Sequence, residues 1–169
     1  GGILGRRGTD DAVMAANHIA PIDLIVVNLY PFAETIARDD CTDAMAIENI
    51  DIGGPAMVRS GAKNHADVLT VTSAEDYAQV VAAMQANQID LEMRRAFAVK
   101  AFRHTAQYDA TVAGYLGAQE PLPASLTLTY SKLDDLRYGE NPHQAAGFYR
   151  EAGKPMSGTI ANYQQLQGK

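Results

Sequence analysis

The sequence has 169 residues, of which 47% are hydrophobic and 20% are charged, a balance typical of a soluble globular chain. Its formal net charge is −6. The single cysteine, Cys41, excludes an internal disulfide and a cysteine-only metal cluster, as expected in a reducing compartment. The sequence has no long basic run and no apolar stretch of the roughly 20 residues that a membrane helix needs, so we expect neither nucleic-acid binding nor a membrane span.

Helix and strand patterns alternate along most of the chain. The expected elements are a helix over 10–17 capped by Thr9 or Asp10, a strand over 22–27 that ends by Pro31, a helix over 42–50, a helix that is opened by the turn over 51–55 and runs to about Gly61, a strand over 68–72, a helix from a Ser73 cap through Met84, and a long helix from Asp90 to about Leu116. This order requires crossover connections and therefore predicts an α/β fold with a parallel sheet. Both strands are continuous apolar runs and are expected to be buried on both faces.

The pattern changes after residue 116. Pro121 and Pro123 indicate a linker over 117–125, followed by an expected strand over 126–130 and a short strand over 147–149. We therefore predict a domain boundary near residues 118–128. The residues after it are too few to fold alone without partner surface.

The first candidate site is the end of the strand over 22–27. Ligands collect beyond the carboxyl ends of strands in open α/β sheets, and Val27, Asn28 and Tyr30 leave the strand there. The alternative is a turn asparagine followed by a half-buried structural tyrosine.

The second candidate site is the helix that begins after Asp51. Gly53 and Gly54 expose backbone amides and allow a ligand to approach closely. We expect Lys63 just past the end of this helix, where it either interacts with helix carbonyls or converges with Asp51 to move a proton. The glycine pattern alone does not decide between these alternatives.

The third candidate site is the polar stretch over 135–144. Arg137 is suited to a bidentate grip on a phosphate, and His143 to proton donation or ligation, unless the stretch is a solvated loop. The Arg94–Arg95 pair and Arg103 are expected on a solvated face of the long helix. The spacing of the histidines and Cys41 predicts no metal site.

Four motifs in series resemble the bifunctional purine biosynthesis proteins, which join an IMP cyclohydrolase domain to an AICAR transformylase domain. They are the residues over 26–32, 48–55, 61–65 and 136–144. The resemblance implies a methylglyoxal-synthase-like α/β domain, whose C-terminal part would be residues 1–127, and the beginning of an α+β transformylase domain over 128–169. It also implies that the first strands of the family's fold precede Gly1 and that a catalytic Lys-His segment follows Lys169.

The resemblance further implies ring closure of formyl-AICAR to IMP with loss of water, without a metal or redox cofactor. By this resemblance Lys63 is the main proton donor or acceptor, Asp51 its partner and Tyr30 a hydrogen-bonding stabiliser. By the same resemblance, five residues match the positions that contact the nucleotide in the family: Val27, Asn28, Asp51, Ile52 and Gly53. Arg137 and Tyr138 match the AICAR-binding pair of the transformylase, which uses 10-formyltetrahydrofolate as co-substrate.

The resemblance also implies a homodimer at full length and a cytoplasmic location. We expect the 169-residue chain to be inactive alone, since parts of both sites would lie outside it. The alternative function is a regulatory module that binds a purine nucleotide without turnover. A further alternative is a fragment that has no function of its own.

Overall fold

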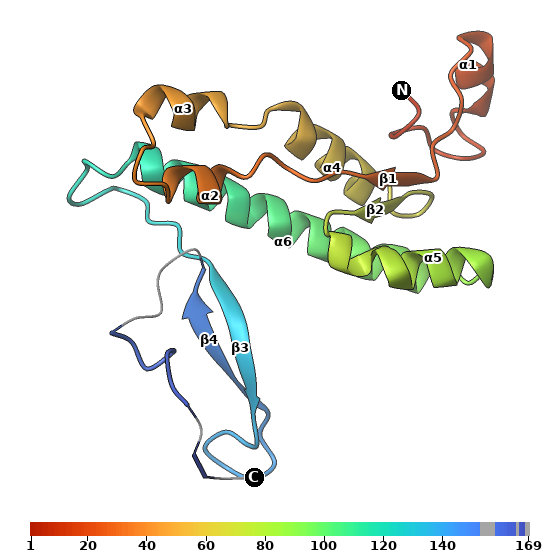
Figure 1. Ribbon diagram of the computed structural model, residues 1–169. Helices are drawn as coiled ribbons and strands as arrows, with labels where there is room; N and C mark the ends of the chain where they lie inside the picture. Colours follow the sequence, from red (N-terminus) through yellow and green to blue (C-terminus); the bar gives the residue numbers. More distant parts are fainter. Residues whose placement is uncertain (153–157, 165, 168–169) are drawn as a thin grey trace. The chain divides into compact units, whose positions relative to one another are not determined.

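A computed structural model describes residues 1–152, 158–164 and 166–167 of the chain (Figure 1). The chain divides into two compact units, Gly1–Asp109 and Ala110–Lys169. The division falls within the longest helix, α6 (Leu91–Leu116).

The first unit is built on a small parallel sheet. β1 (Leu24–Val26) pairs with β2 (Leu69–Val71), Leu24 opposite Leu69 and Val26 opposite Val71, as the crossover pattern predicted. The ladder continues at one end, where the Val27 N–H donates to the Val71 carbonyl at 3.0 Å. Figure 1 shows the two strands side by side, near the helices α4 (Gly53–Lys63), α5 (Tyr77–Gln85) and α6.

The connection from β1 to β2 contains three helices. α2 (Phe32–Ile36) was not predicted. It begins after Pro31, and the hydroxyl of Thr35 donates to the Pro31 carbonyl at 3.0 Å, while Phe32 is almost fully buried. α3 (Asp43–Glu48) confirms the expected helix, and its Thr42 cap accepts the Met45 N–H at 3.2 Å. α4 completes the crossover.

The helix starts agree with the sequence at the predicted Ser73 cap, and the long helix expected from Asp90 begins one residue later, with Asp90 as its cap. Ser73 accepts the Glu75 N–H at the start of the 3₁₀ turn η1 (Ala74–Asp76) that leads into α5, and Asp90 accepts the Met93 N–H at the start of α6. At α1 (Asp11–Ala16) neither predicted cap forms. The Asp10 carboxylate accepts hydrogen bonds from Arg6 instead, and these bonds lower the pKa of Asp10 to about 2.

Two clusters of buried apolar residues lie within the core of this unit. Val58 and Ala62 of α4 pack on Ala98 and Ala101 of α6. The second cluster joins β2, α5 and α6 through Leu69, Val71, Val80 and Phe97. Among the helices of the described residues, none is long and apolar enough to cross a membrane.

A glycine sets the approach of α4 to the sheet. A Cβ at Gly61 would lie 2.5 Å from both Ile25 Cδ1 and Thr70 Oγ1. β2 below it is buried along its whole length, as predicted. β1 is not, because Val26 is 49% exposed, and the expectation of burial on both faces is wrong for this strand.

The described residues of the second unit include an antiparallel hairpin. β3 (Tyr130–Leu136) pairs with β4 (Ala146–Glu151), with an irregularity between Lys132 and Asp134. The strand expected over 147–149 lies within β4. The strand expected over 126–130 is wrong except for Tyr130, because alternation along one segment does not reveal where its partner strand begins and ends.

Candidate functional site

The end of β1, the segment after α3 and the start of α4 enclose an open hollow of about 610 Å³. Its lining includes most of the residues that the sequence assigned to substrate in the first unit. These are Val27, Asn28, Tyr30, Asp51, Ile52 and Gly53, together with Ile47, Glu48, Ile50, Gly54 and Met57. The hollow therefore lies beyond the carboxyl end of a parallel strand, as the first candidate site required.

The carboxylate of Asp51 holds two walls of this hollow together. Its Oδ2 accepts the backbone N–H of Tyr30 at 3.2 Å, and its Oδ1 accepts the backbone N–H of Gly54 at 2.7 Å. The first bond connects the chain after β1 to Asp51. The second satisfies one of the backbone amides at the start of α4 that have no partner within the helix. Asp51 is thus fixed in orientation by main-chain donors from two elements.

The two glycines of this turn have different surroundings. A Cβ at Gly54 would lie 2.4 Å from Asp51 Oδ2 and 2.8 Å from Leu29 Cδ2, so any side chain there would displace the carboxylate. A Cβ at Gly53 would meet no atom within 4 Å. Gly54 is therefore required by the packing of Asp51, whereas Gly53 leaves open space at the hollow.

The side chains of Tyr30 and Ile52 are exposed at the hollow. Tyr30 is 56% exposed and Ile52 79% exposed, so both present surface that a bound molecule could cover. Val27 is half-buried and packs on the cluster formed by α4 and α6, which fixes this side of the hollow.

Tyr108 of α6 braces the same segment and was missed by the sequence analysis as a site residue. Its hydroxyl accepts the N–H of Asp51 at 2.7 Å and donates to the carbonyl of Asn49 at 3.2 Å. Its ring meets Phe32 edge-on, with centroids 6.2 Å apart. The only sequence signal was a tyrosine within the apolar pattern of a helix, where a hydroxyl needs a polar partner.

Lys63 lies away from this hollow. It is the last residue of α4, not a residue beyond it, and Asp51 lies just before the first residue of the same helix. An 11-residue helix rises about 16 Å, so the predicted convergence of Asp51 and Lys63 is not found. Lys63 is exposed, and its side chain makes no hydrogen bond or ion pair with any residue that the structure describes.

The residues that follow Lys63 are held firmly. The Asn64 side chain donates to the carbonyls of Ile3 and Gly5, each at 3.0 Å, and is buried. The Arg94 guanidinium donates to the His65 carbonyl at 3.1 Å and to the Ile89 carbonyl at 3.1 Å. The expectation that Arg94 belongs to a solvated face is therefore wrong, because its side chain is half-buried and binds two main-chain carbonyls.

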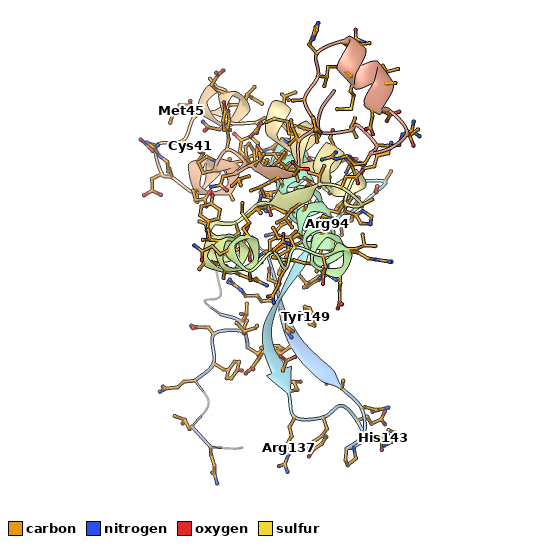
Figure 2. The ribbon with its side chains drawn as sticks, turned by 90° about the vertical axis from the view of Figure 1, so that its right-hand side faces the viewer. Cys41, Met45, Arg94, Arg137, His143 and Tyr149 are labelled. Carbon is orange, nitrogen blue, oxygen red and sulfur yellow. The ribbon has the colours of Figure 1, made fainter. Side chains whose placement is uncertain are left out.

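Arg137 and Tyr138 belong to the second unit and directly follow β3. Arg137 is exposed and Tyr138 is 48% exposed. Figure 2 shows Arg137 and His143 at the turn between the two strands. The turn itself is closed by the Gly139 N–H, which donates to the Gln144 carbonyl at 2.8 Å.

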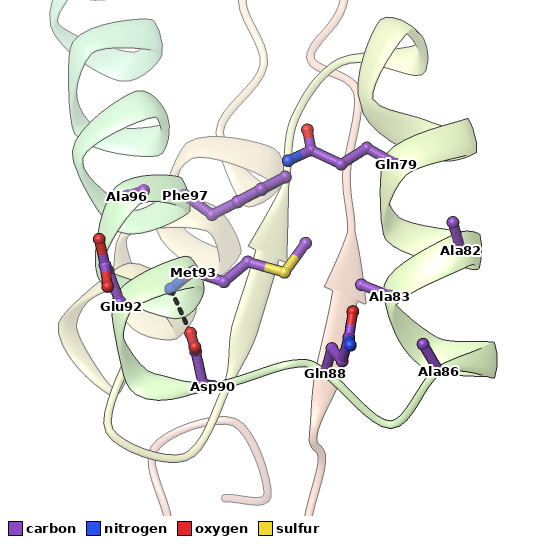
Figure 3. Close-up of a pocket in the computed structure, with 10 residues that line it drawn as sticks. All are labelled: Gln79, Ala82, Ala83, Ala86, Gln88, Asp90, Glu92, Met93, Ala96 and Phe97. Atoms are coloured by element: carbon purple, nitrogen blue, oxygen red, sulfur yellow. Dashed lines mark hydrogen bonds between the residues drawn. The ribbon is translucent and has the colours of Figure 1, made fainter.

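A second hollow, of about 670 Å³, lies between α5 and α6 (Figure 3). Its lining includes four alanines, the apolar side chains of Met93 and Phe97, and four polar or acidic residues. The carboxylate of Asp90 is engaged by the Met93 N–H at 2.8 Å. This hollow contains none of the predicted site residues, so the hollow at the end of β1 is the better candidate.

Three comparisons relate the chain to known proteins. Residues 61–169 match the family model described as "AICARFT/IMPCHase bienzyme". The chain is 51% identical to the bifunctional purine biosynthesis protein PurH of Xylella fastidiosa (strain 9a5c) over 181 aligned residues. This alignment covers 100% of the chain and 34% of PurH. The chain thus spans about a third of the length of this relative.

Among solved structures, the chain is similar to the one described as "Crystal structure of ForH". The TM-score is 0.60 at 36% sequence identity, over 70% of this chain and 63% of that one. Both the fold and the sequence are therefore related.

Proposed function

The chain belongs to the AICARFT/IMPCHase bienzyme family, and on this premise we propose that it serves purine biosynthesis through the ring closure of formyl-AICAR to IMP. The observation that most supports this reaction is the hollow at the end of β1, which collects the residues matched to nucleotide contacts. The whole protein would also formylate AICAR, with 10-formyltetrahydrofolate as co-substrate.

The domain arrangement is part of this proposal. Residues 1–127 would belong to a methylglyoxal-synthase-like cyclohydrolase domain, and residues 128–169 to the beginning of the transformylase domain. The small parallel sheet with its crossover helices supports the first assignment. The separate hairpin after the long helix is consistent with the second.

Ring closure joins a carboxamide nitrogen to the formyl carbon of the same molecule, and water leaves. The site has to hold the two arms together, stabilise the formyl oxygen as it becomes negative, and move protons. Asp51 would act at the carboxamide, with its carboxylate oriented by the amides of Tyr30 and Gly54. The exposed hydroxyl of Tyr30 would donate a hydrogen bond to the developing oxyanion.

Lys63 would be the main proton donor or acceptor. Its place at the far end of α4 from Asp51 requires that the substrate extend between the two groups or that the site include further protein. Its freedom from described partners supports a role toward a ligand more than a role as a helix cap.

Val27, Asn28, Ile52 and Gly53 would contact the nucleotide in the hollow, and Arg137 and Tyr138 would bind AICAR in the transformylase. Homodimer formation and a cytoplasmic location are proposed with the family. All ligands of this scheme are small purine nucleotides and the folate co-substrate.

The test is ring closure by the full-length protein carrying this sequence, measured as conversion of formyl-AICAR to IMP. Asp51→Asn should reduce kcat/KM at least about a hundredfold, since positioned proton transfer typically contributes that much. The matched control is Asp39→Asn, because Asp39 is exposed and is not among the residues that line the hollow. IMP binding without ring closure in the unmodified protein would favour the regulatory module instead.

A further inference from the structure

We propose that Tyr108 is a positioning residue for Asp51, an inference that rests on the proposed ring-closure function. Its hydroxyl connects α6 to the segment between α3 and α4 at two points, one on each side of Ile50. Asp51 in turn connects that segment to the chain after β1 and to α4. The connected series Tyr108–Asp51–Tyr30 therefore joins three parts of the fold at the hollow.

The main chain of Asp51 depends on Tyr108. Asn49 and Ile50 donate their amides to carbonyls of α3, whereas the Asp51 N–H donates to the Tyr108 hydroxyl. Asp51 lies before the first turn of α4 and thus outside the helical ladder. Without the hydroxyl, the residue that carries the carboxylate loses its main-chain anchor.

Tyr108 is itself held in place. Its ring packs edge-on against Phe32, which is 1% exposed. Partial burial, and secondarily the nearby charges of Asp51 and Asp109, raise the pKa of Tyr108. The hydroxyl therefore keeps its proton at neutral pH and can donate to Asn49 while it accepts from Asp51.

The packing explains why the effect should be directional. The two bonds fix the Asp51 backbone, and the close contact of Gly54 leaves its carboxylate no room to shift toward α4. Removing the Tyr108 hydroxyl frees residues 49–51 on the side that faces α6. We expect a misplaced carboxylate with an intact core, because the ring of Tyr108→Phe can keep its contact with Phe32.

The first measurement is hydrogen exchange by mass spectrometry on the full-length protein. Tyr108→Phe should speed exchange of peptides that span residues 49–54 and 27–32, and leave β2 unchanged. The matched control is Tyr77→Phe, because the Tyr77 hydroxyl makes no hydrogen bond with any residue that the structure describes. Unchanged exchange over 49–54 would overturn the positioning role.

The second measurement is the kinetics of ring closure. Loss of one to two ordinary hydrogen bonds predicts a kcat lowered about threefold to tenfold, with KM changed less than about twofold and Tyr77→Phe unaffected. In an Asp51→Asn background, Tyr108→Phe should cause no further loss, because its effect passes through the carboxylate.

The outcomes are distinct. Faster exchange with unchanged kcat, or an additive loss in the double variant, would overturn the proposal. If Tyr108→Phe exchanges faster as expected but the wild-type protein does not close the ring, the proposed function of the chain is overturned. The catalytic role of Tyr108 is then overturned with it. Exchange would still decide whether Tyr108 positions Asp51.

Discussion

In the first unit Phe32, Val58 and Leu69 are at most 1% exposed, whereas none of the described residues from 110 onward is buried. The residues assigned to substrate differ in the same way. Asp51 is oriented by main-chain amides and braced by Tyr108, while Arg137 extends from a hairpin turn. An isolated two-stranded hairpin is at best marginally stable in water. The comparison shows that packing and hydrogen bonds fix Asp51 in the first unit, whereas Arg137 lies on an exposed hairpin turn.

The largest expected difference between the units concerns their cores. Phe32→Ala should destabilise the protein by about 3–5 kcal/mol, because it empties a fully buried position. Phe148→Ala should cost clearly less, because that ring is only half-buried against Tyr163. Thermal unfolding of the full-length protein by circular dichroism measures both. Equal losses would mean that other parts of the protein cover the hairpin.

The next effect concerns Lys63 and catalysis. Lys63→Ala and Lys63→Arg should each reduce ring closure about a hundredfold or more in the full-length protein. Lys100→Ala is the control, because Lys100 pairs with Asp76 and lies outside the hollow lining. A loss below about threefold in both Lys63 variants would contradict the assignment and leave Lys63 as a surface residue at the end of α4.

A smaller effect is expected at the hairpin. Arg137→Ala should weaken AICAR binding and formyl transfer about tenfold to a hundredfold, since a hydrogen bond to a charged group contributes roughly 1.5–3 kcal/mol. Ring closure should be nearly unchanged, and Arg150→Ala on β4 serves as the control. If ring closure fell as far as formyl transfer, the division near residues 118–128 would be wrong.

The smallest effect is a pH dependence within the first unit. Burial, and secondarily the charge of Lys100, lower the pKa of His104. The unfolded chain therefore takes up this proton more readily, so stability is complete above about pH 6.5 and falls as the pH drops from there toward the folded-state pKa.

His104→Gln should remove this part of the acid sensitivity. The measurement is the thermal midpoint at pH 7.5 and at pH 5.5 for the wild type, His104→Gln and His143→Gln, the last being exposed on the second unit. The prediction is contradicted if His104→Gln and the wild type lose the same number of degrees on acidification.

Much of the first unit could be predicted from local sequence. The apolar runs around Leu24–Val26 and Leu69–Val71 marked both strands, and alternation with helices implied their parallel pairing. The rule that ligands bind beyond strand ends pointed to Val27, Asn28 and Tyr30, which line the hollow. These features depend on residues within one element or on the order of elements.

Other features depended on partners distant in the sequence. Nothing near Tyr108 marked the Asp51 amide that it binds, 57 residues away, and nothing near Arg94 marked the His65 carbonyl, 29 residues away. α2 was missed because its short sequence is stabilised by the burial of Phe32 and not by a helical pattern. The extent of β3 was misjudged because β4 sets it.

By itself, the sequence determined the class of fold, the strand end at which the hollow lies, and four motifs that resemble one enzyme family. Only the tertiary structure decided that Asp51 is held by Tyr108, that Lys63 ends α4 at a distance from Asp51, and that Gly54 is required by a carboxylate. The physical reason is that periodicity and capping act over a few residues, whereas hydrogen bonds and packing between elements depend on how whole helices come together.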